Sequence, residues 1–208
     1  MIISHKYKFI YIRNPKTATT SIGKYLETID PDCISSDKST IPYGHETYEE
    51  VKDLVPKDVF DSYFKFTLMR DPKDWFISQY VMNKDYYHYN NERIHILLND
   101  DFILNSPVNN TIDYDDFIMF YVMLTKWFKK NSQLSWVNET LDFIGSFENI
   151  NEDFEKIKDI LKLPDDEPLP KLNNNQSHEY KLSEKSEQLF NILYEKDNQL
   201  YQKLFYAK

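Results

Sequence analysis

The sequence predicts an α/β fold in which a central parallel sheet is flanked by helices. Two apolar, strand-like runs, Lys8–Arg13 and Phe64–Arg70, each lead directly into a helical stretch. Buried strands that alternate with helices form parallel sheets, because the helices carry the chain across the faces of the sheet. The 208 residues, 41% hydrophobic and 16% aromatic, are enough for one substantial core, so we expect a single domain over residues 1–208.

Periodicity and capping residues place the other elements. Helices are expected at Thr20–Thr28, near Tyr48–Leu54, from Pro72 to about Asp85, and over Ile112–Lys129, with a short strand at Phe143–Phe147. A helix that begins at Asn151 should bury one face, formed by Phe154, Ile157, Ile160 and Leu161. A terminal helix that begins at Ser183 should carry on one side Leu189, Phe190, Leu193 and Leu200. For most of their length, residues 84–110 show neither the periodicity of a helix nor that of a strand. A loop this long is usually functional or disordered, and we expect a lid or an acceptor-side loop if it is functional.

Charge and cysteine content exclude several classes of protein. The net charge of -9 argues against nonspecific binding to nucleic acid or to an anionic membrane, since both require a basic face. Cys33 is the one cysteine, so no intrachain disulfide can form. No leader and no apolar stretch of bilayer length is visible, which predicts a soluble, cytoplasmic protein. The sequence does not predict the oligomeric state.

The most informative stretch is the strand-to-helix loop that contains Lys16. Hydroxyl side chains and backbone N–H groups from Thr17 to Ser21 would lie at a helix N-terminus, which binds phosphate-like groups. Between Arg13 and Ile22 there is no glycine, unlike the GxxxxGK[ST] loop of nucleotide triphosphatases. The alternative interpretation is a basic strand-turn-helix whose hydroxyls only cap the helix.

A second strand-to-helix turn follows the run that ends at Arg70. Asp71 can cap the helix and Pro72 suits its first turn. Ser78 lies less than two turns into the helix, so Arg70 and Ser78 could bind the same anion. Taken alone, these residues would more often be a strand-end charge and a solvated helix residue.

These two segments resemble the cofactor-binding elements of sulfotransferases that use 3'-phosphoadenosine-5'-phosphosulfate (PAPS). P-K-T-A-T-T-S at residues 15–21 resembles the 5'-phosphosulfate loop, and R-D-P followed by Ser78 resembles the 3'-phosphate element. The position of Arg13 is most similar to the carbohydrate branch, in its heparan sulfate and uronyl 2-O-sulfotransferase version. GSFENI at 145–150 and PKLNNNQSHEY at 170–180 resemble later family elements. The resemblance implies a P-loop-NTPase-like three-layer fold.

The resemblance also implies an activity and the residues that carry it. A sulfuryl group would move by in-line displacement from PAPS to a hydroxyl, or an amine, of a carbohydrate or other small acceptor, leaving adenosine 3',5'-bisphosphate. The residues implied in cofactor binding are Arg13, Lys16, Thr17, Ala18, Thr19, Thr20, Ser21, Arg70 and Ser78, with Lys171, Asn173 and Ser177 closing over the nucleotide. Glu148 would have a structural role at a strand end.

Three residues are candidates for the chemistry itself. Lys16 would meet the negative charge that builds on the departing nucleotide. His45 is the candidate general base, with Glu46 as the alternative. His5, His88, His95 and His178 have no partner at metal-ligand spacing, so no metal site is predicted.

Two other functions stay open. A nucleotide kinase on a P-loop scaffold should need a glycine-rich loop and carboxylates for magnesium, and neither is evident. A noncatalytic nucleotide-binding protein could keep both loops.

Overall fold

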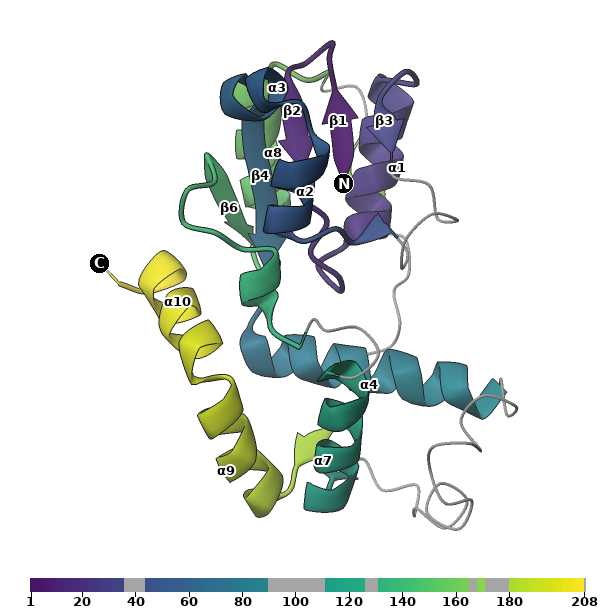
Figure 1. Cartoon of the computed structure of the whole chain (residues 1–208), viewed down its shortest axis with the longest axis vertical. Helices are drawn as coiled ribbons and strands as arrows, with labels where there is room; N and C mark the ends of the chain where they lie inside the picture. The colour runs from purple at the N-terminus through teal and green to yellow at the C-terminus, as the bar shows by residue number, and fades with distance from the viewer. Residues whose placement is uncertain (36–43, 90–110, 126–130, 165–167, 171–179, 208) are drawn as a thin grey trace. The chain divides into compact units, whose positions relative to one another are not determined.

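The computed structural model describes residues 1–35, 44–89, 111–125, 131–164, 168–170 and 180–207 (Figure 1). Contacts divide the chain into two compact units. The first unit comprises Met1–Pro72, Ser132–Asn175 and Lys196–Lys208, and the second comprises Lys73–Asn131 and Gln176–Glu195. The expectation of one domain over residues 1–208 stays a prediction.

The first unit is built on a five-stranded sheet with the order β3-β1-β2-β4-β6. Its strands are β1 (Ile2–Ser4), β2 (Phe9–Tyr11), β3 (Ile34–Ser35), β4 (Phe64–Met69) and β6 (Phe143–Ser146). β2, β4 and β6 are parallel, with Tyr11 paired to Phe66 and Phe66 paired to Phe143. The carboxyl ends of these three strands therefore meet at one edge of the sheet, which is where loops of α/β proteins carry ligand sites.

The predicted parallel sheet is confirmed for β2, β4 and β6, but the two other strands of this sheet are antiparallel. β1 runs antiparallel to β2, and β3 runs antiparallel to β1. Strands of two and three residues show no measurable alternation, so β1 and β3 left no periodic signal in the sequence. The fold is a mixed α/β arrangement with a central sheet and helices, and the P-loop-like three-layer class stays a prediction.

Helices pack on the sheet through the alternating side chains of its strands. Phe66 and Leu68 of β4 lie in a buried cluster with residues of α1 (Thr19–Ile29) and α8 (Ile150–Leu161), among them Ile22, Leu26, Phe154 and Ile157. On the opposite side of β4, Lys65 Nζ donates to the Phe60 carbonyl oxygen of α3 (Lys57–Ser62) over 3.1 Å. Met69 packs there with Tyr201 of α10 (Glu195–Phe205). Figure 1 shows α3 and α2 (Tyr48–Leu54) in front of the strands and α8 behind them.

The second unit contains α4 (Pro72–Tyr89), α7 (Tyr114–Met123), α9 (Glu184–Leu193) and a parallel pair of short strands, β5 (Thr111–Ile112) and β7 (Lys181–Leu182). Its core is aromatic. The Phe76 ring stacks on Phe117 with centroids 4.5 Å apart and meets Phe120, Phe190 and Tyr194 edge-on. Asp113 and Ser183 cap α7 and α9, each accepting a backbone N–H from the first turn.

Several predicted boundaries need correction. α4 continues to Tyr89, so residues 84–89 are helical and only 90–110 of the predicted loop remain, outside the described residues. The helix predicted over Ile112–Lys129 starts later, as α7, and is preceded by β5, while residues 126–129 of that prediction lie outside the described residues. Ser183 does cap a helix, but the predicted terminal helix is two helices, α9 and α10. Ile160 is 51% exposed rather than turned inward. None of the helices in the described part of the chain is both long and apolar enough to span a bilayer.

Candidate functional site

The loop that joins β2 to α1 holds two residues in a conformation that usually requires glycine. Lys16 has φ 63° and Ala18 has φ 57°. A left-handed conformation costs a non-glycine residue roughly 1–2 kcal/mol, and such strain tends to gather at functional sites. The loop thus adopts left-handed backbone conformations at two positions, although it contains no glycine.

Buried hydrogen bonds hold this loop in place. Thr17 Oγ1 donates to the Asn14 carbonyl oxygen over 2.7 Å, and Asn14 Nδ2 donates to the Leu68 carbonyl oxygen of β4 over 2.9 Å. Asn14 and Thr17 are both 0% exposed. Because the Thr17 hydroxyl proton is already donated, this hydroxyl can meet a ligand only as an acceptor, and its contact with Asn14 gives it a structural role as well.

The first turn of α1 lacks the usual side-chain cap. Ala18 is the N-cap residue and makes no capping hydrogen bond. This turn lies at the positive end of the helix dipole. Thr19 and Ser21 are buried, whereas Thr20 is exposed. The dipole of α1 therefore favours negative charge beside this turn.

Lys16 and Arg70 lie close enough to affect one another. They follow β2 and β4, which are adjacent and parallel. Burial lowers the pKa of Lys16 below its usual value, and the Arg70 guanidinium lowers the pKa further. Arg70 also stacks on the Phe147 ring, with its guanidinium carbon 4.5 Å from the ring centroid. The structure thus brings together the cations of the two predicted loops.

Arg13 adds a third cation to the same edge of the sheet. Its side chain is 9% exposed, and its Nε is buried without a hydrogen-bond partner among the described residues. Arg13 Nη2 lies 3.9 Å from the position that a Cβ would take at Gly23, in the second turn of α1. Burying an N–H of a charged group without a hydrogen bond costs free energy, and an anionic ligand could accept that hydrogen bond.

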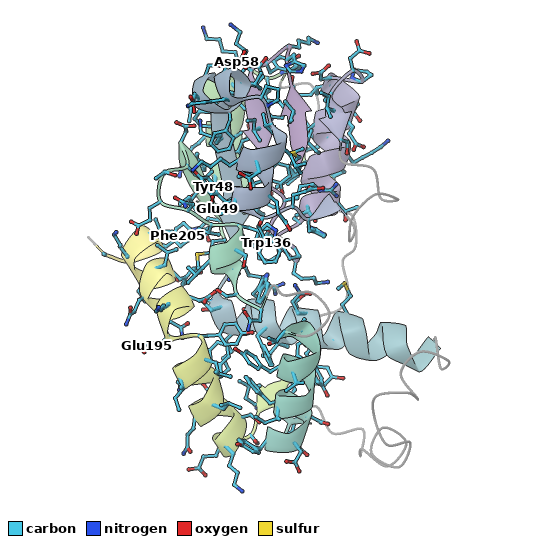
Figure 2. All side chains as sticks on the ribbon, in the orientation of Figure 1. Tyr48, Glu49, Asp58, Trp136, Glu195 and Phe205 are labelled. Carbon is cyan, nitrogen blue, oxygen red and sulfur yellow. The ribbon has the colours of Figure 1, made fainter. Side chains whose placement is uncertain are left out.

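His45 lies beside the same loop through a contact with Arg13. His45 Nδ1 is 2.8 Å from the Arg13 carbonyl oxygen. Because a carbonyl oxygen can only accept, Nδ1 carries the proton, and Nε2 of the neutral ring has the lone pair. Burial lowers the pKa of His45 to about 4. Trp136, which Figure 2 labels, donates from Nε1 to the His45 carbonyl oxygen over 3.1 Å, and this hydrogen bond fixes the His45 backbone.

Glu46, the alternative base, is bound elsewhere. Its carboxylate is 4% exposed and forms an ion pair with the α-ammonium group of Met1. This carboxylate has a stabilising partner, which makes it a less available proton acceptor than the neutral imidazole of His45.

The remaining predicted residues are Ser78, Glu148 and three residues of the late loop. Ser78 is a half-buried residue of α4 in the second unit, so its pairing with Arg70 stays a prediction. Lys171, Asn173 and Ser177 lie outside the described residues. Glu148 has the structural role expected of it, because its carboxylate accepts from the Asp71 backbone N–H and from Tyr201 Oη, both over 2.8 Å.

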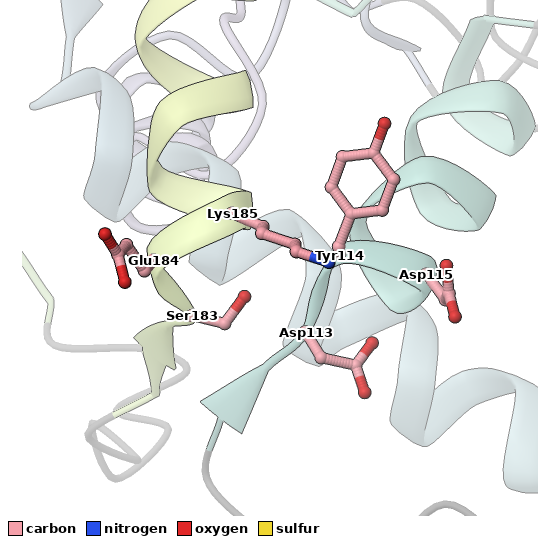
Figure 3. Close-up of a pocket in the computed structure, with 6 residues that line it drawn as sticks. All are labelled: Asp113, Tyr114, Asp115, Ser183, Glu184 and Lys185. Carbon is pink, nitrogen blue, oxygen red and sulfur yellow. The ribbon is translucent and has the colours of Figure 1, made fainter.

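A pocket of about 380 Å³ lies elsewhere, in the second unit, at the starts of α7 and α9. Its lining comprises Asp113, Tyr114, Asp115, Ser183, Glu184 and Lys185. In Figure 3, Lys185 extends from α9 toward Tyr114 on α7. The pocket contains none of the predicted site residues, and three carboxylates against one lysine disfavour an anionic ligand.

A comparison with known families decides what this chain is. A family model described as the sulfotransferase family matches residues 1–207. The chain belongs to the sulfotransferase family. Sulfotransferase membership supports sulfuryl transfer as the activity, and the match covers both of the predicted anion-binding loops. No curated protein matches this sulfotransferase.

The sequence analysis missed several polar residues of this sulfotransferase. Hydrogen bonds over long sequence separations join Asn14 to Gln133, Gln133 to the Arg70 backbone, and Trp136 to the His45 backbone. A lone Asn or Gln carries no motif, so no sequence signal could have found them. The described residues contain no cluster of three His, Cys, Asp or Glu that could hold a metal ion. The expectation that no metal is needed stays a prediction.

Proposed function

We propose that this sulfotransferase moves a sulfuryl group from PAPS to a hydroxyl, or an amine, of a carbohydrate or other small acceptor. PAPS would supply the group by in-line displacement and leave as adenosine 3',5'-bisphosphate. Family membership supports the reaction class, and the P-K-T-A-T-T-S and R-D-P segments support the donor. The place of Arg13 supports the carbohydrate branch, in its heparan sulfate or uronyl 2-O form.

The proximity of Lys16 and Arg70 carries this proposal. Two cations at the ends of adjacent parallel strands repel one another, and this repulsion adds to burial in lowering the pKa of Lys16. Burial is the larger cause of that shift, and the Arg70 charge is the second. A ligand with an anionic group at each end would offset the repulsion. A nucleotide with both a 5'-phosphosulfate and a 3'-phosphate is such a ligand.

The other residues of the loop also fit this nucleotide. The buried Nε of Arg13, which has no hydrogen-bond partner among the described residues, favours a phosphate or sulfate oxygen, and so does the positive end of the α1 dipole. Lys16, Arg13 and residues Thr17–Ser21 would hold the 5' end, and Arg70 would hold the 3'-phosphate, with Ser78 as its predicted partner. Lys16 would also stabilise the charge that develops on the leaving oxygen.

His45 is the proposed general base. The Arg13 carbonyl oxygen fixes the tautomer, so Nε2 would accept the proton of the acceptor group. A pKa of about 4 keeps the ring neutral at physiological pH, which makes the base available but weak. Glu46 stays the alternative, and the ion pair with Met1 counts against it.

Part of the proposal rests on the sequence alone. We expect residues 84–110 to contribute to acceptor recognition, beyond the helical part that ends at Tyr89. We also expect a soluble, cytoplasmic, single-domain protein that takes a small-molecule or glycan acceptor and binds neither nucleic acid nor membranes. The rival functions are a noncatalytic nucleotide-binding protein and a nucleotide kinase. The absence of glycine from the Lys16 loop disfavours the kinase.

A transfer assay with labelled PAPS tests this function. The purified protein and its Lys16→Met variant would be incubated with labelled PAPS and a panel of sugars, glycans and small hydroxylated or amino compounds. We expect label in at least one acceptor with the wild type, and much less with the variant. Binding of adenosine 3',5'-bisphosphate without transfer to any acceptor would favour the noncatalytic rival instead.

A further inference from the structure

Gln133 is a fully buried glutamine whose side-chain amide lies between the two cation-bearing loops. It begins the short 3-10 helix η3 (Gln133–Ser135) and is 0% exposed. Nothing in the family resemblance marks this residue. Its three side-chain hydrogen bonds, all within the first unit, reach two segments that are far apart in the sequence.

Two of these hydrogen bonds hold the backbone of Arg70. Gln133 Nε2 donates to the Arg70 carbonyl oxygen over 2.8 Å, and Gln133 Oε1 accepts from the Arg70 N–H over 3.0 Å. The β4–β6 pairing ends at Met69 and Ser146. The amide therefore bonds the N–H and C=O of the next residue as a neighbouring strand would, and it restricts both backbone dihedrals of Arg70.

The third hydrogen bond joins Gln133 to the Lys16 loop. Asn14 Nδ2 donates to Gln133 Oε1 over 2.9 Å, and the same nitrogen donates to the Leu68 carbonyl oxygen. Asn14 in turn accepts the Thr17 hydroxyl through its own carbonyl oxygen. One glutamine oxygen thus accepts from both sides, from the backbone that carries Arg70 and from the loop that carries Lys16.

Gln133 is itself held by a buried carboxylate. Asp197 Oδ1 accepts from the Gln133 backbone N–H over 2.9 Å, and Asp197 Oδ2 accepts from Ser132 Oγ over 2.8 Å. Asp197 is 2% exposed. With backbone and amide both bonded, the glutamine has little freedom to rotate away, so it can transmit a fixed spacing rather than follow its neighbours.

We propose that Gln133 is a positioning residue that sets the spacing between Lys16 and Arg70, so that both cations can bind the two ends of one nucleotide. This inference rests on the proposed function. If Gln133 acts in this way, removing its amide should leave each loop able to bind an anion separately. The loss of affinity should be confined to ligands that must contact both loops at the same time.

The test compares a two-ended with a one-ended nucleotide. Dissociation constants for adenosine 3',5'-bisphosphate and for adenosine 5'-phosphate would be measured by calorimetry or ligand-detected NMR, on the wild type and on Gln133→Met, which keeps the volume and removes the amide. We expect the variant to bind the bisphosphate about tenfold more weakly or worse, the usual size of coupling between linked groups, and the monophosphate within about twofold of wild type.

Ser4→Ala is the matched control. Ser4 is also buried, donates to Asp30 Oδ2 over 2.6 Å and accepts from the Tyr7 N–H over 2.9 Å. It pairs with Phe9, at the opposite end of β2 from the Lys16 loop. This control should lose thermal stability as Gln133→Met does and keep the wild-type affinity for both nucleotides. If Gln133→Met does not fold, Asn14→Ala removes the link to the Lys16 loop and carries the same expectation.

The outcomes separate this inference from the proposed function. A wild type that binds neither nucleotide refutes the proposed function. In a second outcome, the wild type binds the bisphosphate, but the Gln133 variant keeps both affinities or loses both equally. This result refutes the positioning role and leaves the proposed function standing. An equal selective loss in Ser4→Ala would also refute it, because general destabilisation would then explain the effect.

Discussion

Replacing His45 by glutamine should change how stability depends on pH, by an amount that follows from the burial of the imidazole. Burial lowers the pKa of His45 from 6.5 to about 4, although the hydrogen bond to the Arg13 carbonyl oxygen acts in the opposite direction. The unfolded chain keeps the ordinary pKa, so between about pH 6.5 and pH 4 it binds a proton that the folded protein does not. The neutral imidazole of His45 therefore makes its full contribution to stability above pH 6.5, and this contribution is lost as the pH falls from about 6.5 to about 4.

The size of this effect follows from the two pKa values. A pKa difference of one corresponds to about 1.4 kcal/mol, so the difference between 6.5 and about 4 amounts to roughly 3.5 kcal/mol, of which about 2.5 kcal/mol is reached near pH 4.5. Urea unfolding of wild type and His45→Gln at about pH 8 and about pH 4.5 measures it. Glutamine does not titrate, so we expect the wild type to lose about 2.5 kcal/mol relative to the variant on acidification. Carboxylates that titrate equally in both proteins cancel. A stability difference that is the same at both pH values would refute the buried, neutral imidazole.

Three further predictions concern the cations, the base and the glycines. Lys16→Met should lower kcat in the labelled-PAPS assay on the order of a hundredfold or more, while thermal unfolding stays at or above the wild-type midpoint because a buried charge beside Arg70 is removed; unaltered turnover would exclude Lys16 from the mechanism. His45→Ala should abolish most turnover and Glu46→Ala should reduce it less, and the reverse order would make Glu46 the base. Gly23→Ala should raise the unfolding free energy by about 0.5–1 kcal/mol, because its Cβ would meet Ile2 Cδ1 at an ordinary 3.5 Å. Gly145→Ala should lower the unfolding free energy, since its Cβ would lie 3.2 Å from Phe143 Cε1. If chemical unfolding finds both variants more stable than the wild type, or neither, these two expectations are contradicted.

The parts of the fold that the sequence predicted are those with a local signal. The runs that became β2 and β4, the turn at Lys16 and the turn at Asp71-Pro72 combine an apolar strand, an abrupt polar break and a helix start within a few residues. Each is specified by neighbours in the chain, so periodicity and capping rules find it. The short strands β1, β3, β5 and β7 have two or three residues and no such signal.

The parts of the site that the sequence did not predict depend on contacts between distant segments. Asn14 and Gln133 are 119 positions apart, and Asp197 follows Gln133 by 64. Each residue type is common on surfaces and in turns, so only the fold reveals that they share one buried network. The positive φ of Lys16 and Ala18 was equally hidden, because sequence rules expect glycine where the backbone turns this way.

The central claim is that Lys16 and Arg70 together bind the two anionic ends of one adenosine nucleotide. The most direct test is a thermal-shift titration with adenosine 3',5'-bisphosphate, compared with ATP plus magnesium, on the wild type and on Arg70→Ala. A ligand stabilises the native state by RT ln(1 + [L]/Kd), so the shift reports affinity. We predict a larger shift with the bisphosphate than with ATP and magnesium, and a loss of that preference in Arg70→Ala. An equal or larger shift with ATP and magnesium, or a preference that survives the loss of Arg70, would contradict the account.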